Sequence, residues 1–264
     1  MSELLKFLQE KVVFLPVVLP EEHQFDFEGD FEEYLWDTPF DGKINALHFK
    51  INNPKGVILY FHGNSDNLHR WGSIAAEFTQ YGYNVLVMDY RGYGKSSGVR
   101  NEDYLYSDAQ FFYDFAKKNY GEEKIVVYGR SLGGAFAVKV AADYMPKMVI
   151  LEATFYNLQD IANRWLPGKV TDRVSLRMTY HFLSNENILS LKVPLYQFHG
   201  TKDTVIPLKS GKKLFEVFEK EHPEIPKKFI EIKGGNHHDL VNFEEFNSEI
   251  KKIFVMKNPA GPPQ

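Results

Sequence analysis

The residue of this sequence that is best placed to act as a nucleophile is Ser131, in the segment GRSLG at 129–133. A β-branched run at 125–128 precedes the segment and predicts a buried strand, and a small-residue pattern at 135–144 predicts a closely packed helix. A sharp turn from strand to helix lifts a serine hydroxyl away from the backbone, and glycines let the flanking segments approach it. The pattern therefore predicts a nucleophile elbow with Ser131 at its tip.

A serine hydroxyl is a weak nucleophile at neutral pH, so it needs an imidazole that takes its proton and a carboxylate that orients the imidazole. Candidates for the carboxylate and for the imidazole follow two later predicted strands. Asp203 comes after the apolar run 193–199, and His237 and His238 come after the strand pattern 228–232. The chain order of serine, acid and histidine is typical of α/β-hydrolases and differs from the order in the two main types of serine protease.

With these residues the chain resembles the α/β-hydrolase-fold serine hydrolases, above all the small bacterial serine aminopeptidase and esterase-like members related to membrane-associated eukaryotic hydrolases. The family's closing motif, Gly-x-Gly-His-Asn-Asp, aligns with residues 234–239. The resemblance implies that His237 is the catalytic base and that His238 is a loop residue at the position of the family's asparagine. A metal site on His237, His238 and Asp239 is disfavoured, because consecutive side chains point apart and no further ligand pattern accompanies them.

A second turn is expected to supply hydrogen-bond donors for the charge that develops on the substrate oxygen. The apolar run 57–61 ends in His62, Gly63 and Asn64. The family pattern implies that the backbone amide of Asn64 is one donor and the amide of Leu132, next to the nucleophile, is the other. His62 is expected to brace the loop, since the triad already has its base.

Two further features of the sequence have structural interpretations. We predict that Arg130 pairs with Glu152 at the end of the next strand, with a substrate carboxylate as the alternative partner. Glu152 is also an alternative triad acid, although Asp203 matches the usual position better. The glycine-rich loop 90–98 lacks the Walker spacing of a phosphate-binding loop, and the resemblance identifies it as a structural loop after the fourth strand.

The order of the predicted elements indicates an α/β fold. Strand and helix patterns alternate from residue 57 to the last histidine, which predicts a mainly parallel sheet with helices on both faces. The resemblance implies the α/β-hydrolase fold with a small cap. Alternating segments at 25–34 and 44–51 flank an Asp-Gly turn and predict an antiparallel hairpin at the edge of the sheet.

We expect the hydrolase domain to span residues 25–257, and an apolar stripe at 243–255 predicts its last helix. The proline-rich tail 258–264 is expected to be disordered. Residues 1–24 form a lead-in segment with interrupted apolar runs, too short for a transmembrane span and without a signal peptide. An amphipathic segment packed on the domain is favoured, with a peripheral membrane contact as the alternative. We predict a cytoplasmic protein or one at the membrane periphery.

The segment 154–191 between two predicted strands is longer than a simple crossover and is the candidate cap. Its aromatic residues, Phe155 and Trp165 among them, could line an apolar acyl pocket above the serine, while its arginines could meet anionic groups. Packing on the body and exposure to solvent are equally good interpretations for any one of these residues. A small cap predicts a preference for short acyl chains over long triglycerides.

Composition agrees with a single enzyme domain. The 264 residues are 44% hydrophobic, which is enough for one large core. A formal net charge of −4 with scattered basic residues gives no electrostatic case for a nucleic-acid partner. The sequence has no cysteine, which removes disulfides and thiolate metal sites. We expect a small-molecule or acylated substrate, no cofactor and no metal, and we assign no oligomeric state.

The sequence thus predicts a serine hydrolase that cleaves a carboxylic ester or thioester through an acyl-enzyme, with Ser131, His237 and Asp203 as its triad. A peptidase or amidase of the serine aminopeptidase type is the first alternative. It would need a pocket for a free amino terminus, and the cap has no clustered acidic motif. A non-catalytic binding protein on the same fold is the second alternative.

Overall fold

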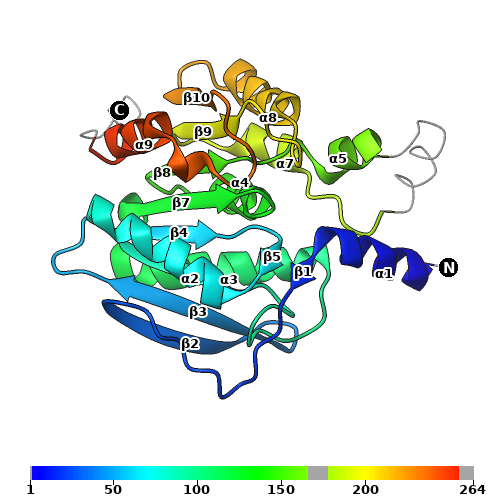
Figure 1. The fold of residues 1–264 in the computed structure, drawn as a ribbon, viewed down its shortest axis with the longest axis vertical. Helices are drawn as coiled ribbons and strands as arrows, with labels where there is room; N and C mark the ends of the chain where they lie inside the picture. The colour runs from blue at the N-terminus through cyan, green and yellow to red at the C-terminus, as the bar shows by residue number, and fades with distance from the viewer. Residues whose placement is uncertain (1, 166–177, 256–264) are drawn as a thin grey trace.

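The computed structural model describes residues 2–165 and 178–255. Within these residues the centre is an eight-stranded sheet with the order β10-β9-β8-β7-β4-β6-β3-β2 (Figure 1). Its strands are β2 (Asp30–Thr38), β3 (Gly42–Lys50), β4 (Val57–Phe61), β6 (Asn84–Met88), β7 (Ile125–Arg130), β8 (Met148–Glu152), β9 (Leu195–Gly200) and β10 (Lys227–Ile232). β3 pairs antiparallel with β2 and β6, and the other neighbours pair in parallel. The predicted α/β fold with a mainly parallel sheet is confirmed.

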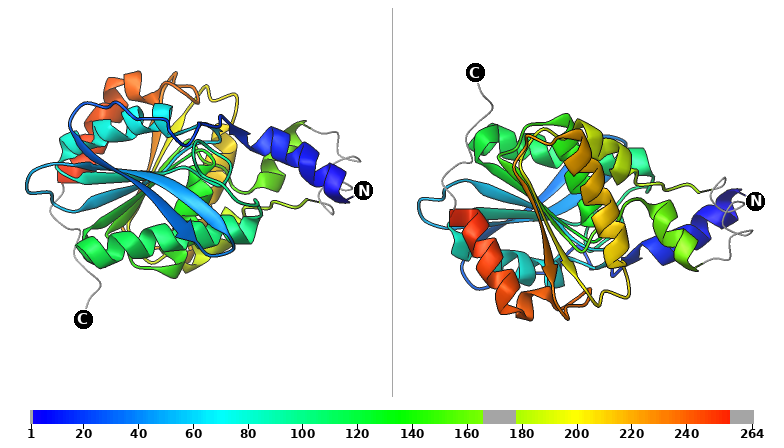
Figure 2. Two further views of the ribbon diagram at one scale, coloured as in Figure 1. Left: turned by 90° about the horizontal axis from the view of Figure 1, so that it is seen from below. Right: turned by 90° about the horizontal axis from the view of Figure 1, so that it is seen from above.

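The helices connect these strands and cover both faces of the sheet. Their bounds are α1 (Ser2–Val13), α2 (Leu68–Ala76), α3 (Glu102–Tyr120), α4 (Gly133–Asp143), α5 (Leu158–Trp165), α7 (Ser184–Asn187), α8 (Leu208–Glu221) and α9 (Glu244–Val255). Short 3-10 turns lie at Glu77–Tyr81, Glu122–Lys124, Ile188–Ser190 and Leu240–Asn242. Figure 2 shows α3, α4 and α8 on one face and α2 and α9 on the other.

The sheet separates two hydrophobic cores because successive strand residues point to opposite faces. In the central strand β4, Val57, Leu59 and Phe61 join the core under α3, α4 and α8, whereas Ile58 and Tyr60 join the core under α2 and α9. Every residue of β4 is fully buried. A continuous apolar run is therefore required, which is why the sequence pattern at 57–61 is apolar at each position.

The predicted antiparallel hairpin is present, but its first strand begins later than expected. β2 starts at Asp30 rather than at residue 25, and it pairs with β3 across a turn in which Phe40 and Asp41 both have positive φ. The apolar residues before β2 pack on a helix instead of forming a strand, since Phe27 contacts Gly72 of α2. An irregular segment that packs on a helix can alternate apolar and polar residues as a strand does. Sequence periodicity alone does not distinguish the two.

The N-terminal segment packs on the body and on the cap. After α1, Phe14 is buried, and its ring lies 5.0 Å from the ring of Tyr180 in the second half of the cap. Gln9 of α1 donates a hydrogen bond to the Tyr180 carbonyl at 2.9 Å. The ribbon views place α1 and α5 at the same end of the molecule (Figures 1 and 2). The favoured interpretation of a segment packed on the domain agrees with these contacts.

The last helix, α9, is confirmed, and Phe246, Ile250, Ile253 and Phe254 of the predicted stripe are buried. The predicted disordered tail lies outside the described residues, and the domain boundaries stay predictions. No helix within residues 2–165 and 178–255 has the length and apolar character that crossing a membrane requires.

The buried histidine of β3 makes the stability of the fold depend on pH. His48 is 5% exposed, and its Nε2 lies 2.5 Å from the Tyr120 hydroxyl. Burial, followed by the charge of Lys50, lowers the pKa of His48 to about 4. In the unfolded chain a histidine has a pKa of about 6.5, so the unfolded state binds the extra proton first and stability falls as the pH drops from about 6.5 to about 4.

We expect His48→Gln to reduce the loss in the free energy of unfolding between pH 6.5 and 4.5 by on the order of 2 kcal/mol. The replacement keeps a polar group and removes the titratable imidazole. Denaturant unfolding of both proteins at several pH values measures the effect. His181→Gln, which removes an exposed imidazole, is the control. A His48→Gln protein with the same slope as the parent would contradict the assignment.

Candidate active site

Close packing at the end of β7 creates the turn that presents Ser131. The residue has a positive φ of 53°, a conformation that is rare for residues with a side chain. A Cβ atom at Gly129 would lie 2.6 Å from the Cβ of Ala137, and one at Gly133 would lie 2.0 Å from the carbonyl oxygen of Phe61. Gly129 therefore lets β7 and α4 approach each other, and Gly133 lets the start of α4 lie against the end of β4.

The structure brings Ser131, His237 and Asp203 together from three loops at the carboxyl ends of β7, β9 and β10. The Ser131 Oγ lies 3.0 Å from the His237 Nε2, and the His237 Nδ1 lies 2.8 Å from the Asp203 Oδ2. The three residues are 6–7% exposed. When the Nδ1–H group donates a hydrogen bond to the carboxylate, the unprotonated Nε2 can accept the serine proton. This arrangement can activate a hydroxyl for attack on a carbonyl carbon.

The loop after β9 holds the carboxylate of Asp203 in place. Its Oδ1 accepts hydrogen bonds from the amides of Val205 at 2.9 Å and Ile206 at 2.8 Å. His199, at the end of β9, lies 3.5 Å from the Asp203 Oδ2 and donates through Nε2 to the Ile206 carbonyl at 2.9 Å. Burial lowers the pKa of His199, which favours the neutral ring. Sequence reasoning missed His199, although a histidine within a buried apolar strand was a usable signal.

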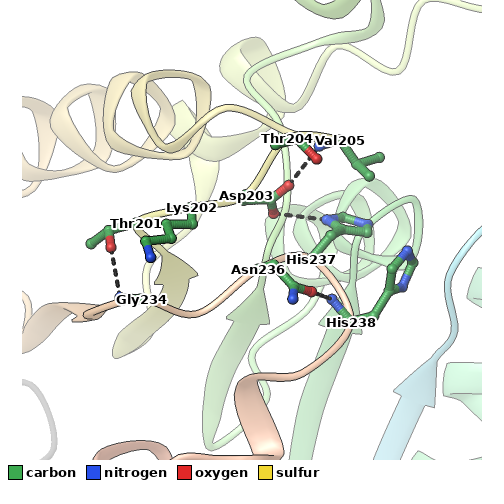
Figure 3. Close-up of a pocket in the computed structure, with 9 residues that line it drawn as sticks. All are labelled: Thr201, Lys202, Asp203, Thr204, Val205, Gly234, Asn236, His237 and His238. Atoms are coloured by element: carbon green, nitrogen blue, oxygen red, sulfur yellow. Dashed lines mark hydrogen bonds and ion pairs between the residues drawn. The ribbon is translucent and has the colours of Figure 1, made fainter.

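The two adjacent histidines occupy different surroundings. His237 is buried and faces Asp203, whereas His238 is exposed and lies on the side of His237 that is remote from Asp203 (Figure 3). The amide of His238 donates to the Asn236 side chain at 2.9 Å, and the two imidazole rings meet edge to face at 5.0 Å. Only His237 of the two therefore reaches the serine in this structure.

The predicted oxyanion loop is held by His62. The His62 Nδ1 donates to the Gly63 carbonyl at 2.7 Å, and its Nε2 lies 3.2 Å from the Asp89 Oδ1. In a trans peptide the N–H and C=O groups point in opposite directions, so fixing the Gly63 carbonyl also fixes the direction of the Asn64 amide. The Leu132 amide lies before the first turn of α4, where backbone donors have no partner inside the helix. Both predicted donors are thus backbone groups in constrained segments.

The N-terminal segment also contacts this loop. No pattern in the sequence predicted this contact. β1 (Leu15–Pro16) pairs in parallel with β5 (Ser65–Asp66), directly after Asn64. The Asn64 carbonyl accepts one hydrogen bond from the Leu15 amide at 2.8 Å and another from the Tyr93 hydroxyl at 2.7 Å. The loop is therefore fixed from both sides, by His62 through Gly63 and by Leu15 and Tyr93 through Asn64.

The predicted pair between Arg130 and Glu152 is confirmed. The Arg130 Nε lies 3.3 Å from the Glu152 Oε1, and the Tyr128 hydroxyl donates to the other carboxylate oxygen. Arg130 also reaches the His237 carbonyl through Nη2 at 3.4 Å. Glu152 thus supports the elbow and the histidine loop, while the contact with the His237 ring is made by Asp203.

Of the two predicted pocket residues, only Phe155 has a described side chain, and it is not among the residues that line the cavity at Ser131. Phe155 is 3% exposed and belongs to the hydrophobic core under α4. Trp165 is the last residue of α5, and its side chain lies outside the described residues. A role of either residue in substrate binding stays a prediction. Among the described residues, no group of three or more His, Cys, Asp or Glu side chains is placed to hold a metal ion.

Two cavities adjoin the triad. One is lined by Asp203, His237 and other residues of the loops at 201–205 and 234–238 (Figure 3). The other contains Ser131 in its wall, together with the oxyanion loop, His237 and His238. Because a substrate carbonyl must reach the serine hydroxyl, the second cavity is the candidate substrate site.

The fold and this geometry define a hydrolase of the α/β-hydrolase class. The family model described as serine aminopeptidase, S33, matches residues 52–188, just over half of the chain. The chain therefore belongs to this family.

Similar proteins include lysophosphatidylserine lipase ABHD12 of Danio rerio, which is 30% identical over 244 residues, covering 84% of this chain and 59% of that protein. The uncharacterized protein YfhR of Escherichia coli K12 is 29% identical over 195 residues, covering 71% of this chain and 65% of YfhR. The chain thus spans about three fifths to two thirds of the length of these relatives.

Among solved structures, the Pyrococcus furiosus esterase Pf2001 superposes with a TM-score of 0.69 at 21% identity, covering 92% of this chain and 96% of the esterase. At this level of identity the likeness shows a shared fold. The α/β-hydrolase fold expected from the sequence is thereby confirmed.

Proposed function

We propose that this protein is a serine hydrolase that cleaves a carboxylic ester or thioester through an acyl-enzyme intermediate. The observation that carries the proposal is the buried chain of hydrogen bonds from the Ser131 hydroxyl through His237 to Asp203, at 3.0 and 2.8 Å. Such a chain matches the roles of nucleophile, base and orienting acid in a Ser-His-Asp triad. The lipase named among its relatives supports an ester substrate.

In the proposed mechanism the Ser131 Oγ attacks the substrate carbonyl carbon while His237 takes the hydroxyl proton. Asp203 stabilises the imidazolium, and the amides of Asn64 and Leu132 donate hydrogen bonds to the oxyanion. Collapse of the intermediate breaks the ester bond, and His237 protonates the departing alcohol or thiol. Water then attacks the acyl-enzyme with His237 as base, which releases the carboxylic acid and restores Ser131.

An aminopeptidase is the second candidate, because the matched family carries that name. Such an enzyme must hold a protonated amino group beside the scissile amide, for which carboxylates are the suitable partners. The described residues around the cavity at Ser131 include Arg70 and Arg130 and no carboxylate. The described lining therefore offers no carboxylate to a protonated amino group, which supports an ester or thioester over a peptide with a free amino terminus.

Replacement of the nucleophile tests the proposal. We expect Ser131→Ala to lower kcat for p-nitrophenyl butyrate by about a millionfold, because the acyl-enzyme no longer forms. Stopped and continuous absorbance assays measure the rate, and the unfolding midpoint verifies that the variant is folded. Ser107→Ala on α3, away from the site, is the matched control.

A fluorophosphonate probe separates the enzyme from a non-catalytic binding protein. The probe should label the parent and the Ser107→Ala protein and leave Ser131→Ala unlabelled. Hydrolysis by Ser131→Ala at the parent's rate, or labelling of that variant at the parent's level, would refute the assignment of Ser131.

The support of the oxyanion loop gives a second prediction. Tyr93→Phe removes one of the two hydrogen bonds to the Asn64 carbonyl, so the loop should hold the Asn64 amide less firmly in the transition state. We expect kcat for p-nitrophenyl butyrate to fall about fivefold with little change in KM, since the net value of one hydrogen bond is about 1 kcal/mol.

The matched control is Tyr113→Phe, which removes a buried tyrosine hydroxyl that bonds Glu122 far from the site. This variant should lose a similar amount of stability while keeping the parent kcat. Equal kcat values for Tyr93→Phe and Tyr113→Phe would contradict the proposed role of the loop.

A further inference from the structure

The imidazole of His62, under the predicted oxyanion loop, has an oxygen atom beside each of its two nitrogens. Nδ1 lies 2.7 Å from the Gly63 carbonyl oxygen, and Nε2 lies 3.2 Å from the Asp89 Oδ1. Neither Nε2 nor Oδ1 has another hydrogen-bond partner among the described residues. A neutral imidazole carries one N–H group, so it donates to one of these oxygens and presents a lone pair to the other. A neutral ring beside an ionised carboxylate therefore lacks one proton.

Burial makes this lack costly. The side chains of His62 and Asp89 are both fully buried, so water neither pairs with the opposed lone pairs nor screens the carboxylate charge. Burial raises the pKa of Asp89, although the hydrogen bond and the charge of His62 act in the opposite direction. One additional proton removes the net charge and supplies the missing donor. Because the two groups interact closely, this proton belongs to the pair rather than to either residue.

Aromatic rings surround the imidazole. Trp71 of α2 stacks on it at 5.4 Å between ring centres, and Tyr90 and Tyr93 approach it at 4.3 and 5.5 Å. Burial raises the pKa of both tyrosines, so their hydroxyls stay protonated up to about pH 10. A titration near His62 in that range is therefore not a titration of these tyrosines.

The charges around Asp89 do not supply the missing proton. Its Oδ2 accepts a hydrogen bond from the Leu68 amide at 3.0 Å, at the start of α2. The charge of Asp66 raises the pKa of Asp89 further. Arg70 and Arg130 approach the Trp71 ring at 5.3 and 5.4 Å, and each is paired with a carboxylate of its own. The Asp89 Oδ1 thus depends on His62 for a donor.

We propose that His62 and Asp89 share one additional proton and that this proton holds the oxyanion loop in its active conformation. The inference rests on the proposed hydrolase function. With the proton present, Nδ1 donates to the Gly63 carbonyl while a hydrogen bond joins Nε2 to Asp89. After its loss the single ring proton serves only one of the two oxygens, and two lone pairs face each other at the second. The Gly63 peptide, and with it the Asn64 amide, then loses its fixed direction.

The pH dependence of kcat tests the proposal in the full chain. With p-nitrophenyl butyrate, and after subtraction of spontaneous hydrolysis, we expect kcat to fall about tenfold toward about pH 10 as the pair loses its proton. This loss is smaller than the hundredfold to thousandfold cost of removing an oxyanion donor, because the displaced amide is still present. KM should change little, since the oxyanion forms only during the reaction. A kcat that stays level up to this pH would overturn the proposal.

Asp89→Asn separates the proton from the support of the loop. The new amide nitrogen can donate to the His62 Nε2 while its oxygen accepts from the Leu68 amide, so the ring proton stays on Nδ1 at every pH. We expect the variant to keep about a fifth of the parent kcat or more at neutral pH and to lose the alkaline fall. Asp114→Asn, the same exchange at an exposed position of α3, is the matched control and should keep the fall. An Asp89→Asn protein with the alkaline fall of the parent would contradict the shared proton.

The fluorescence of Trp71 tests the pair in the parent protein, whether or not Asp89→Asn folds. The difference in emission between the parent and Trp71→Phe gives the contribution of this indole. Loss of the proton adds a negative charge beside the stacked rings, so we expect this emission to change with the same midpoint as kcat while the far-ultraviolet circular dichroism stays constant. Emission that is constant across the fall in kcat would count against the proposal.

The outcomes distinguish this inference from the proposed function. If the parent hydrolyses the ester and is labelled by a fluorophosphonate, but Asp89→Asn keeps the alkaline fall, the shared proton is wrong and the hydrolase assignment stands. If the parent neither hydrolyses the ester nor is labelled, the proposed function fails and the inference with it.

Discussion

The backbone conformation of Ser131 is the constraint on which the site depends. A positive φ at a residue with a side chain costs free energy, and surrounding contacts must hold it. The Ser131 amide donates to the Glu152 carbonyl at 2.8 Å, and the Ser131 carbonyl accepts from the Thr154 hydroxyl at 3.0 Å. The Glu152 side chain pairs with Arg130, which reaches the His237 carbonyl. One strand end, that of β8, therefore ties the elbow to the histidine loop.

The oxyanion loop depends on segments that are distant in sequence. The Asn64 carbonyl is held by Leu15 from the N-terminal segment and by Tyr93 from the loop after β6. The same N-terminal segment contacts the cap through Gln9 and Phe14. A displacement of this segment would therefore break contacts at the predicted oxyanion donor and at the cap together. The N-terminal segment therefore supports the site through these contacts.

The sequence predicted most of the fold because buried parallel strands require apolar runs and the elbow requires glycines. It also predicted that Ser131, Asp203 and His237 would meet, since the carboxyl ends of parallel strands share one edge of a sheet. The contact of Leu15 with Asn64 could not be predicted, because a two-residue parallel pairing leaves no periodicity. The late start of β2 was missed because Phe25 and Phe27 alternate like strand residues while packing as irregular chain.

The side chains that line the cavity beside the serine bear on the chemistry that the family and the fold leave open. Fold and triad are compatible with esters, thioesters and amides, so specificity must come from the side chains around the cavity. The described lining of the cavity at Ser131 contains no carboxylate that could hold a protonated amino terminus, and the buried Arg130 is already paired with Glu152. This lining is the reason why an ester or thioester is proposed over the peptide chemistry that the family's name suggests.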